Sequence, residues 1–193
     1  MSSRIRKTIL TVFDVFCEVA APEKGNEKGE ILMKYPEDYN NEKTLSDIGM
    51  FTFPIGASQD TSEAVQLFCF ALTGMDADYS FGFCRHTPKS NTCICIVSAL
   101  PWVNVFFSLL NHIASIMNSN SSPDDLEALL VRAYHQELPE PGSNFVVESS
   151  LGRNKLECYC PDHLRLPTIQ HNRNLSDYYT VVDEHHMMAI FAQ

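Results

Sequence analysis

The sequence predicts an α/β domain in which a mainly antiparallel sheet of five strands packs against helices. Five segments have the alternating or continuously apolar character of strands, and two later segments carry apolar residues at a spacing of three and four. Hydrophobic residues make up 45% and charged residues 20% of the 193 residues, as in ordinary globular proteins. A sheet face and two helical stripes cannot be buried separately, so packing the helices on the sheet buries both.

The first elements are predicted from alternation and from turn residues. Apolar residues alternate around Asp14 and Glu18, which is a strand pattern, and Pro36 ends the next apolar run. Leu45 and Ile48 lie three residues apart, as on one side of a helix. We therefore expect, in order, a strand over 9–20, an exposed loop over 22–30, a strand over 31–35 and a short helix over 44–50.

The next group of elements consists of three strands followed by two helices. Alternation places Cys93, Cys95 and Val97 on one face of the last strand. Pro101 suits the first position of a helix, and Ser122 is a good N-cap for the second helix. The expected elements are strands over 65–73, 79–86 and 92–99, and helices over 101–117 and 123–136.

Two apolar stretches resemble targeting or membrane segments. The first, near the N-terminus, is interrupted by Asp14 and Glu18, whereas a signal peptide needs an unbroken apolar region. The second, over 90–123, contains no Asp, Glu, Lys or Arg, but its pattern changes from strand to helix at Pro101. We interpret this second stretch as a buried strand that leads into a buried helix.

A domain boundary is predicted after the second long helix. Residues 137–143 contain two prolines and a glycine among charged residues, which is the composition of a linker between a first domain over 9–136 and a second over 144–193. The second domain should contain strands over 144–149 and 155–160, a loop over 166–174 and a helix from about Asp183. Because that helix still shows an apolar side at the last residue, we expect the second domain to be truncated.

Four motifs follow one another along the chain. They are Lys34-Tyr35-Pro36-Glu37-Asp38-Tyr39, Phe81-Gly82-Phe83-Cys84-Arg85, the corner from Cys95 to Trp102 with Leu109-Leu110-Asn111, and Leu166-Pro167-Thr168-Ile169 with Arg173-Asn174-Leu175. Together with the order of elements, they resemble DENN-domain proteins, whose upstream part is longin-like. The residues of these motifs are most similar to those of the connecdenn group, and the resemblance covers roughly residues 11–193.

This resemblance implies a guanine-nucleotide exchange factor for a Rab-family GTPase in clathrin-dependent endocytosis and endosomal recycling. It implies a longin-like upstream lobe over 9–136 and the beginning of a central α/β DENN lobe over 144–193, with the GTPase bound between such lobes. It further implies a cytoplasmic protein that is peripheral on clathrin-coated vesicles or endosomes. Clathrin adaptor proteins and phosphoinositide membranes are candidate partners through regions absent from this chain.

Nucleotide exchange makes and breaks no covalent bond, since the factor only binds the nucleotide-free GTPase more tightly than the loaded form. We therefore expect no catalytic residue and no cofactor, but a surface of aromatic, acidic and arginine residues. By motif position, the candidate GTPase contacts are Tyr35, Glu37, Asp38, Arg85 and Trp102. Each has a structural alternative: the aromatic residues as core, the acids as solvated loop residues and the arginine in an ion pair within the sheet.

Other chemistries have weaker support. Cys158, Cys160 and His163 could ligate zinc, but the paired spacing of zinc sites is missing, so we expect no metal. A thiol nucleophile at Cys84 would need His86 beside it, and we expect the strand to hold these two side chains apart. The net charge of −10 argues against nucleic acid as a partner. The seven cysteines, an odd number, indicate reduced thiols as in the cytosol.

The main functional alternative is a longin-type trafficking adaptor or scaffold. Such a protein would bind a GTPase without exchanging its nucleotide. The chain is not itself a GTPase of the usual kind, because it lacks the glycine-rich phosphate-binding loop that ends in Gly-Lys.

Overall fold

A computed structural model of the chain describes residues 8–23, 26–54, 64–74, 78–87, 91–119, 123–148 and 155–162. The predicted loop over 166–174, the motif around it, the helix from Asp183 and His163 lie outside the described residues. The elements are β1 (Val15–Ala20), β2 (Glu30–Tyr35), α1 (Glu42–Phe51), β3 (Gln66–Thr73), β4 (Tyr79–Thr87), β5 (Thr92–Ser98), α2 (Val103–Asn118), α3 (Pro123–Tyr134), β6 (Asn144–Glu148) and β7 (Lys155–Tyr159).

Five strands form one sheet in the order β2-β1-β5-β4-β3, and every neighbouring pair is antiparallel. The predicted five-stranded antiparallel sheet with helices is therefore confirmed. Strand β1 begins at Val15 rather than at residue 9. The chain just before it is still tied to the sheet, since the amide of Asp14 donates to the carbonyl of Val97 at 2.7 Å.

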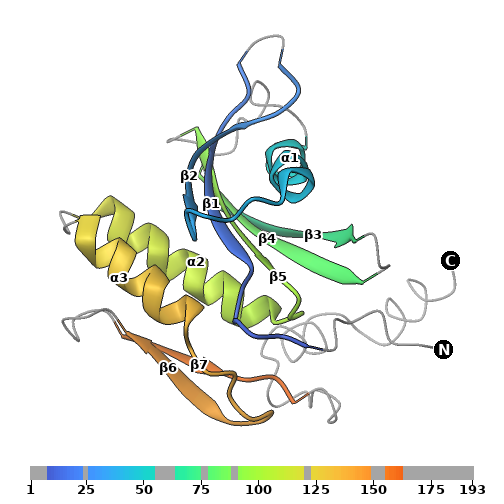
Figure 1. The fold of residues 1–193 in the computed structure, drawn as a ribbon. Coiled ribbons are helices and arrows are strands. Elements are labelled where there is room, and N and C mark those ends of the chain that lie inside the picture. Colours follow the sequence, from blue (N-terminus) through green and yellow to red (C-terminus); the bar gives the residue numbers. More distant parts are fainter. Residues whose placement is uncertain are drawn as a thin grey trace, which may run out of the picture. The chain divides into compact units, whose positions relative to one another are not determined.

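Helices cover both faces of this sheet (Figure 1). The alternation of β1 sends Val15, Cys17 and Val19 into a core beneath α1. Phe16 enters a second core, on the opposite face, which α2 and α3 complete. Both faces of β1 thus contribute to a core, and Glu18 shares the second face with Phe16.

Helix α1 starts earlier than predicted because a side chain caps it. Asn41 accepts a hydrogen bond from the amide of Thr44 at 3.1 Å, which satisfies one of the free amides of the first turn. Ile48 is fully buried under the helix. At the helix end, the carbonyl of Gly49 accepts from the amide of Gly29 at 2.8 Å, so α1 is fastened to the start of β2.

A buried serine shapes the corner between β5 and α2. The hydroxyl of Ser98 donates to the carbonyl of Val12 at 2.7 Å and accepts from the amide of Leu100 at 3.0 Å. Helix α2 then begins at Val103, two residues later than predicted, and the ring of Phe106 stacks on Phe83 at 4.6 Å. The expected buried strand and buried helix are confirmed. None of the helices in the described ranges has the length and apolar character needed to span a bilayer.

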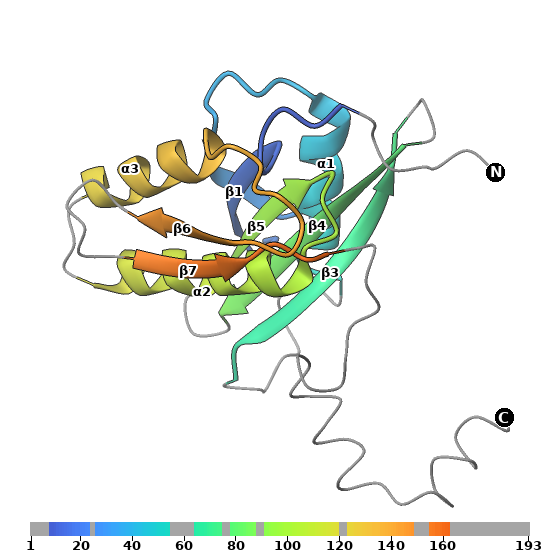
Figure 2. The same ribbon diagram turned by 90° about the horizontal axis from the view of Figure 1, so that it is seen from below.

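The hairpin β6–β7 packs against α2 and α3, as Figure 2 shows from below. Phe145, Val147 and Cys158 on its inner face join the core of these helices. Just before β6, Gly142 and Ser143 both bond to Cys160: the amide of Gly142 donates to the Cys160 carbonyl at 2.9 Å, and the Cys160 amide donates to the carbonyl of Ser143 at 2.9 Å. This is the pattern of a β-bulge, and Gly142 has φ 82°, a conformation that favours glycine. One compact unit therefore continues through the predicted linker at 137–143 as far as Cys160.

Glu18 is the one acidic residue within β1, where Met33 and Ile94 flank it on the neighbouring strands. It points to the face that α2 and α3 cover and is half-buried. Burial raises the pKa of the Glu18 carboxyl above its ordinary value, because a partly dry environment disfavours the charged form. The charged carboxylate therefore weakens the fold at neutral pH.

We expect Glu18→Gln to stabilise the protein at pH 7. A raised folded pKa means that the native protein holds this proton more tightly than the unfolded chain, so stability falls as pH rises from the ordinary pKa through the folded one. The stability gap between variant and wild type should widen over that window, starting near pH 4.5, and then level off. Urea unfolding of both proteins at several pH values measures it. Glu30→Gln, at an exposed position of β2, is the control, and an equal gain there would contradict the assignment.

A second prediction concerns Gly82, at the centre of β4. A methyl group on this residue would lie 2.2–2.6 Å from ring atoms of Phe70, which covers the glycine from β3. Gly82→Ala should destabilise the protein by about 1–3 kcal/mol, because the ring must leave its place. Phe70→Ala should remove most of that penalty in the double variant. If the losses of stability in the double-mutant cycle are strictly additive, the ring of Phe70 is not the cause of the Gly82→Ala destabilisation.

Candidate functional site

The motif after β2 places one aromatic ring and two acids at a corner of the sheet. The ring of Tyr35 meets Tyr134 of α3 edge-to-face at 5.7 Å, while Glu37 and Asp38 are exposed. Burial, followed by the proximity of Tyr134, Glu127 and Asp38, raises the pKa of the Tyr35 phenol, which stays protonated and able to donate. The corner thus offers carboxylates to a partner from a position that α3 supports.

Arg85 connects β4 to α2. Its Nε donates to the Asn111 side chain at 2.9 Å, and its terminal nitrogen donates to the Thr87 hydroxyl at 2.7 Å. Burial lowers the pKa of the Arg85 guanidinium, which nevertheless remains charged at neutral pH. The alternative role for Arg85 was an ion pair with an acid in the sheet. The structure instead shows hydrogen bonds to two neutral acceptors, Asn111 and Thr87.

Trp102 is a core residue. Only 8% of its surface is exposed, and its ring lies 6.5 Å from Phe106 and 6.2 Å from Phe145. It therefore joins the start of α2 to the hairpin β6–β7. This is the packing role that we considered as the alternative to GTPase contact.

The five candidate residues do not share one surface. Tyr35 lies on the edge strand β2, whereas Arg85 is on β4, with β1 and β5 between them. Trp102 is buried beneath the hairpin. Of the five, only the adjacent Glu37 and Asp38 are exposed, so the corner after β2 is the part of the predicted site that the fold presents to a partner.

Four buried thiols gather beneath α1, from Cys17, Cys84, Cys93 and Cys95. The register puts Cys95 opposite both Cys17 and Cys84. Burial, reinforced by the neighbouring thiols, raises the pKa of Cys84, and burial likewise raises that of Cys17. The thiols of Cys84 and Cys17 therefore stay protonated at neutral pH, and all four cysteines pack as small apolar groups in this core.

The expected separation of Cys84 from His86 is wrong. Residues two apart in a strand return to the same face, and the ring of His86 meets Phe53 in the same layer at 5.3 Å. The raised pKa of Cys84, and not the geometry of the strand, is what argues against a thiol–imidazole pair.

Cys158 and Cys160 also face the core. Burial raises the pKa of Cys158 to about 11, and the thiol of Cys160 donates to the carbonyl of Pro139 at 3.6 Å. Within the described ranges, no cluster of three or more His, Cys, Asp and Glu residues could hold a metal ion. His163, the third zinc candidate, is outside those ranges.

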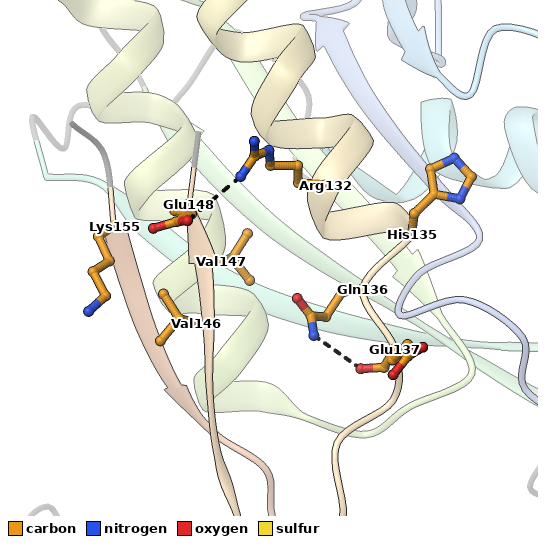
Figure 3. A pocket seen from close by; sticks show the side chains of 8 residues that line it. All are labelled: Arg132, His135, Gln136, Glu137, Val146, Val147, Glu148 and Lys155. Carbon is orange, nitrogen blue, oxygen red and sulfur yellow. Dashed lines mark hydrogen bonds and ion pairs between the residues drawn. The ribbon is translucent and has the colours of Figure 1, made fainter. Parts of the chain in front are cut away.

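A groove of about 600 Å³ lies between the end of α3 and the hairpin (Figure 3). It is lined by Arg132, His135, Gln136, Glu137, Val146, Val147, Glu148 and Lys155. Arg132 and Glu148 approach each other at 3.7 Å, but both side chains are about half exposed, so the pair contributes little to stability. Sequence patterns could not predict this groove, because it forms only when the hairpin folds back onto α3.

Two protein-family models match this chain, and the boundary between the two matches falls within the sheet. The uDENN domain matches residues 29–87, and the DENN (AEX-3) domain matches residues 89–193. The two matches meet between β4 and β5, which are paired strands of one sheet. The divide between the families is therefore not a divide in the fold.

Curated relatives align with the full length of the chain. DENN domain-containing protein 1A of Xenopus laevis is 35% identical, over 100% of this chain and 18% of that protein. The corresponding values are 34%, 100% and 24% for protein 1B of Mus musculus, and 34%, 100% and 19% for protein 1A of Homo sapiens. The chain thus spans 18–24% of the length of these three relatives. It belongs to the DENN-domain family, and it is similar to the connecdenn proteins, as its motifs indicated.

Proposed function

We propose that the protein to which this chain belongs is a guanine-nucleotide exchange factor for a Rab-family GTPase, and that this chain supplies part of the GTPase-binding surface. The observation that carries the proposal is similarity over the whole chain to DENN domain-containing proteins 1A and 1B. Because the chain spans a minor share of these relatives, the activity of the complete protein belongs to the proposal. Protonated, buried thiols fit a regulator that works by binding.

The acidic corner after β2 is the contact surface that we propose. Glu37 and Asp38 are exposed there, and Tyr35 is held from behind by Tyr134. Acids on such a supported corner suit basic side chains of a GTPase and speed its approach. Exchange then requires tighter binding of the nucleotide-free form than of the loaded form, so that bound GDP and its magnesium ion leave.

The proposed setting is clathrin-dependent endocytosis and endosomal recycling. The support is the similarity of the motifs to the connecdenn group. We propose a cytoplasmic protein, peripheral on clathrin-coated vesicles or endosomes, with clathrin adaptors and phosphoinositide membranes as partners of other regions. Arg85 and Trp102 would then act by holding α2 and the hairpin in place.

A second candidate function is that of a trafficking adaptor or scaffold that binds a GTPase without exchanging its nucleotide. It is favoured for this chain taken alone, because the chain spans only 18–24% of the three relatives described above. An exchange factor that binds a GTPase between two lobes needs a larger contact surface than one acidic corner.

The first experiment measures nucleotide release. Rab GTPases loaded with fluorescent GDP are mixed with the complete protein and, separately, with this chain, and human DENN domain-containing protein 1A is run in parallel. We expect the complete protein to accelerate release from at least one of the GTPases. Binding without acceleration would favour the adaptor. Neither binding nor acceleration across the panel would contradict both proposals.

The second experiment tests the acidic corner by charge reversal. Changing Glu37 and Asp38 to lysine together should slow association with the GTPase about tenfold at low salt, and the loss should shrink as salt screens the charges. Glu137 and Glu140, exposed on the loop after α3, are reversed in the matched control. Stopped-flow association rates give the comparison. Equal slowing in the control would mean that net charge, and not this corner, guides the encounter.

A further inference from the structure

Strand β3 and helix α2 contain no charged residue. Their sequences, Gln66–Thr73 and Val103–Asn118, lack Asp, Glu, Lys and Arg, although such residues make up 20% of the chain. This absence extends to the exposed positions of both elements. On α2, the exposed residues include Asn104, Ser108 and Ser115. Surfaces that depart from the usual charge content in this way are typical of the centre of protein interfaces.

Among the described residues, the edge of β3 is open except at its end, where Lys43 of α1 donates to the carbonyl of Thr73 at 3.5 Å. It is the last strand of the sheet, and β4 is its one partner among the described strands (Figure 2). The pairing runs through eight residues without a bulge, and the strand has no proline. Leu67 is 40% exposed, and Cys69 and Ala71 are exposed beside it. Natural edge strands normally carry a charge, a proline or a bulge, because an open regular edge pairs with further strands.

The register shows which backbone groups face outward. The amide of Gly74 donates to the carbonyl of Asp78 at 2.8 Å, which makes this a hydrogen-bonded position of the β3–β4 ladder. Such positions alternate with others whose amides and carbonyls point away from the partner strand. The outward groups therefore belong to Leu67, Cys69, Ala71 and Thr73, and the carbonyl of Thr73, at the end of the strand, accepts from Nζ of Lys43 at 3.5 Å. Their side chains also lie on one face, the face that α2 shares.

The flank of α2 continues this surface. Phe107 packs on Phe83 of β4 at 6.1 Å, and Asn111 accepts from Arg85 of the same strand. This side of the helix thus borders the exposed side chains of β3. Val103, one turn before Phe107, is 42% exposed. Strand edge, apolar strand face and helix flank form one surface, which we call the β3–α2 surface.

We infer that the β3–α2 surface binds a second copy of this chain, by antiparallel pairing of two β3 strands about a twofold axis at Cys69. This arrangement sets Cys69 opposite Cys69 of the second copy, and Leu67 opposite Ala71. The outward amides and carbonyls of each strand then meet those of the other, and the two sheets become one sheet of ten strands. The exposed apolar side chains of both strands leave water together.

A second copy fits this surface because a twofold contact brings identical patches together. Each chain carries a net charge of −10, so two copies repel each other over most orientations. The β3–α2 surface is where they can meet without opposing like charges. This inference goes beyond the proposed exchange function and does not depend on it.

Sedimentation velocity of the full chain at increasing concentration tests the inference. We expect a reversible dimer, strengthened by salt because salt screens the net charge. Cys69→Lys should raise the dissociation constant at least about tenfold, because it sets two ammonium groups directly opposite each other. Cys69→Ser, which is neutral, should keep the dimer. Leu67→Lys, which pairs an ammonium with Ala71 of the second copy, is a further disrupting variant.

Val146→Lys is the matched control, since Val146 is 37% exposed on the outer face of β6. It should leave the dimer intact. Cys69 is the one exposed cysteine of the seven, all of which the structure describes, so a short bismaleimide should join wild-type chains and fail with Cys69→Ser. A chain that stays monomeric up to about 200 µM overturns the inference. A dimer whose dissociation constant Cys69→Lys leaves unchanged would overturn it too. The inference would also be wrong if the chain is monomeric and Cys69→Lys abolishes GTPase binding.

Discussion

The pairing of β1 with β5 is the interaction on which the rest of the structure depends. It joins the first strand to the last of the sheet, from Val15 opposite Val97 to Ala20 opposite Thr92. Apolar side chains leave both strands on both faces, so the sheet needs cover on both sides, from α1 on one and from α2 and α3 on the other. The same pairing holds Ser98 at the point where the chain turns into α2.

Once the sheet is covered on both sides, its remaining surfaces differ in character. The corner after β2 is acidic, with Tyr35 supported by α3. The opposite edge is uncharged along the whole of β3. Binding energy for a charged partner is therefore available at one edge of the sheet, and strand pairing at the other. A regulator with no reactive centre works through such differences in surface chemistry.

Local patterns in the sequence were sufficient to predict the strands and helices, because period and turn chemistry are properties of short segments. The common face of Cys93, Cys95 and Val97 follows from alternation alone. The environment of Trp102 does not, because it depends on Phe145 in a hairpin far along the chain. Arg85 shows the same limit, since its acceptor Asn111 comes from α2. Contacts between distant segments decided which candidate residues reach the surface and which became core.

The boundary between the two family matches, after residue 87, lies between two hydrogen-bonded strands, β4 and β5. A polypeptide ending there would keep Phe83 without the helix ring that stacks on it, and one starting there would lack β1 as a neighbour for β5. A fusion protein built from this fold must therefore carry both matched regions together, since either one alone would leave half of the sheet and an open row of backbone amides and carbonyls.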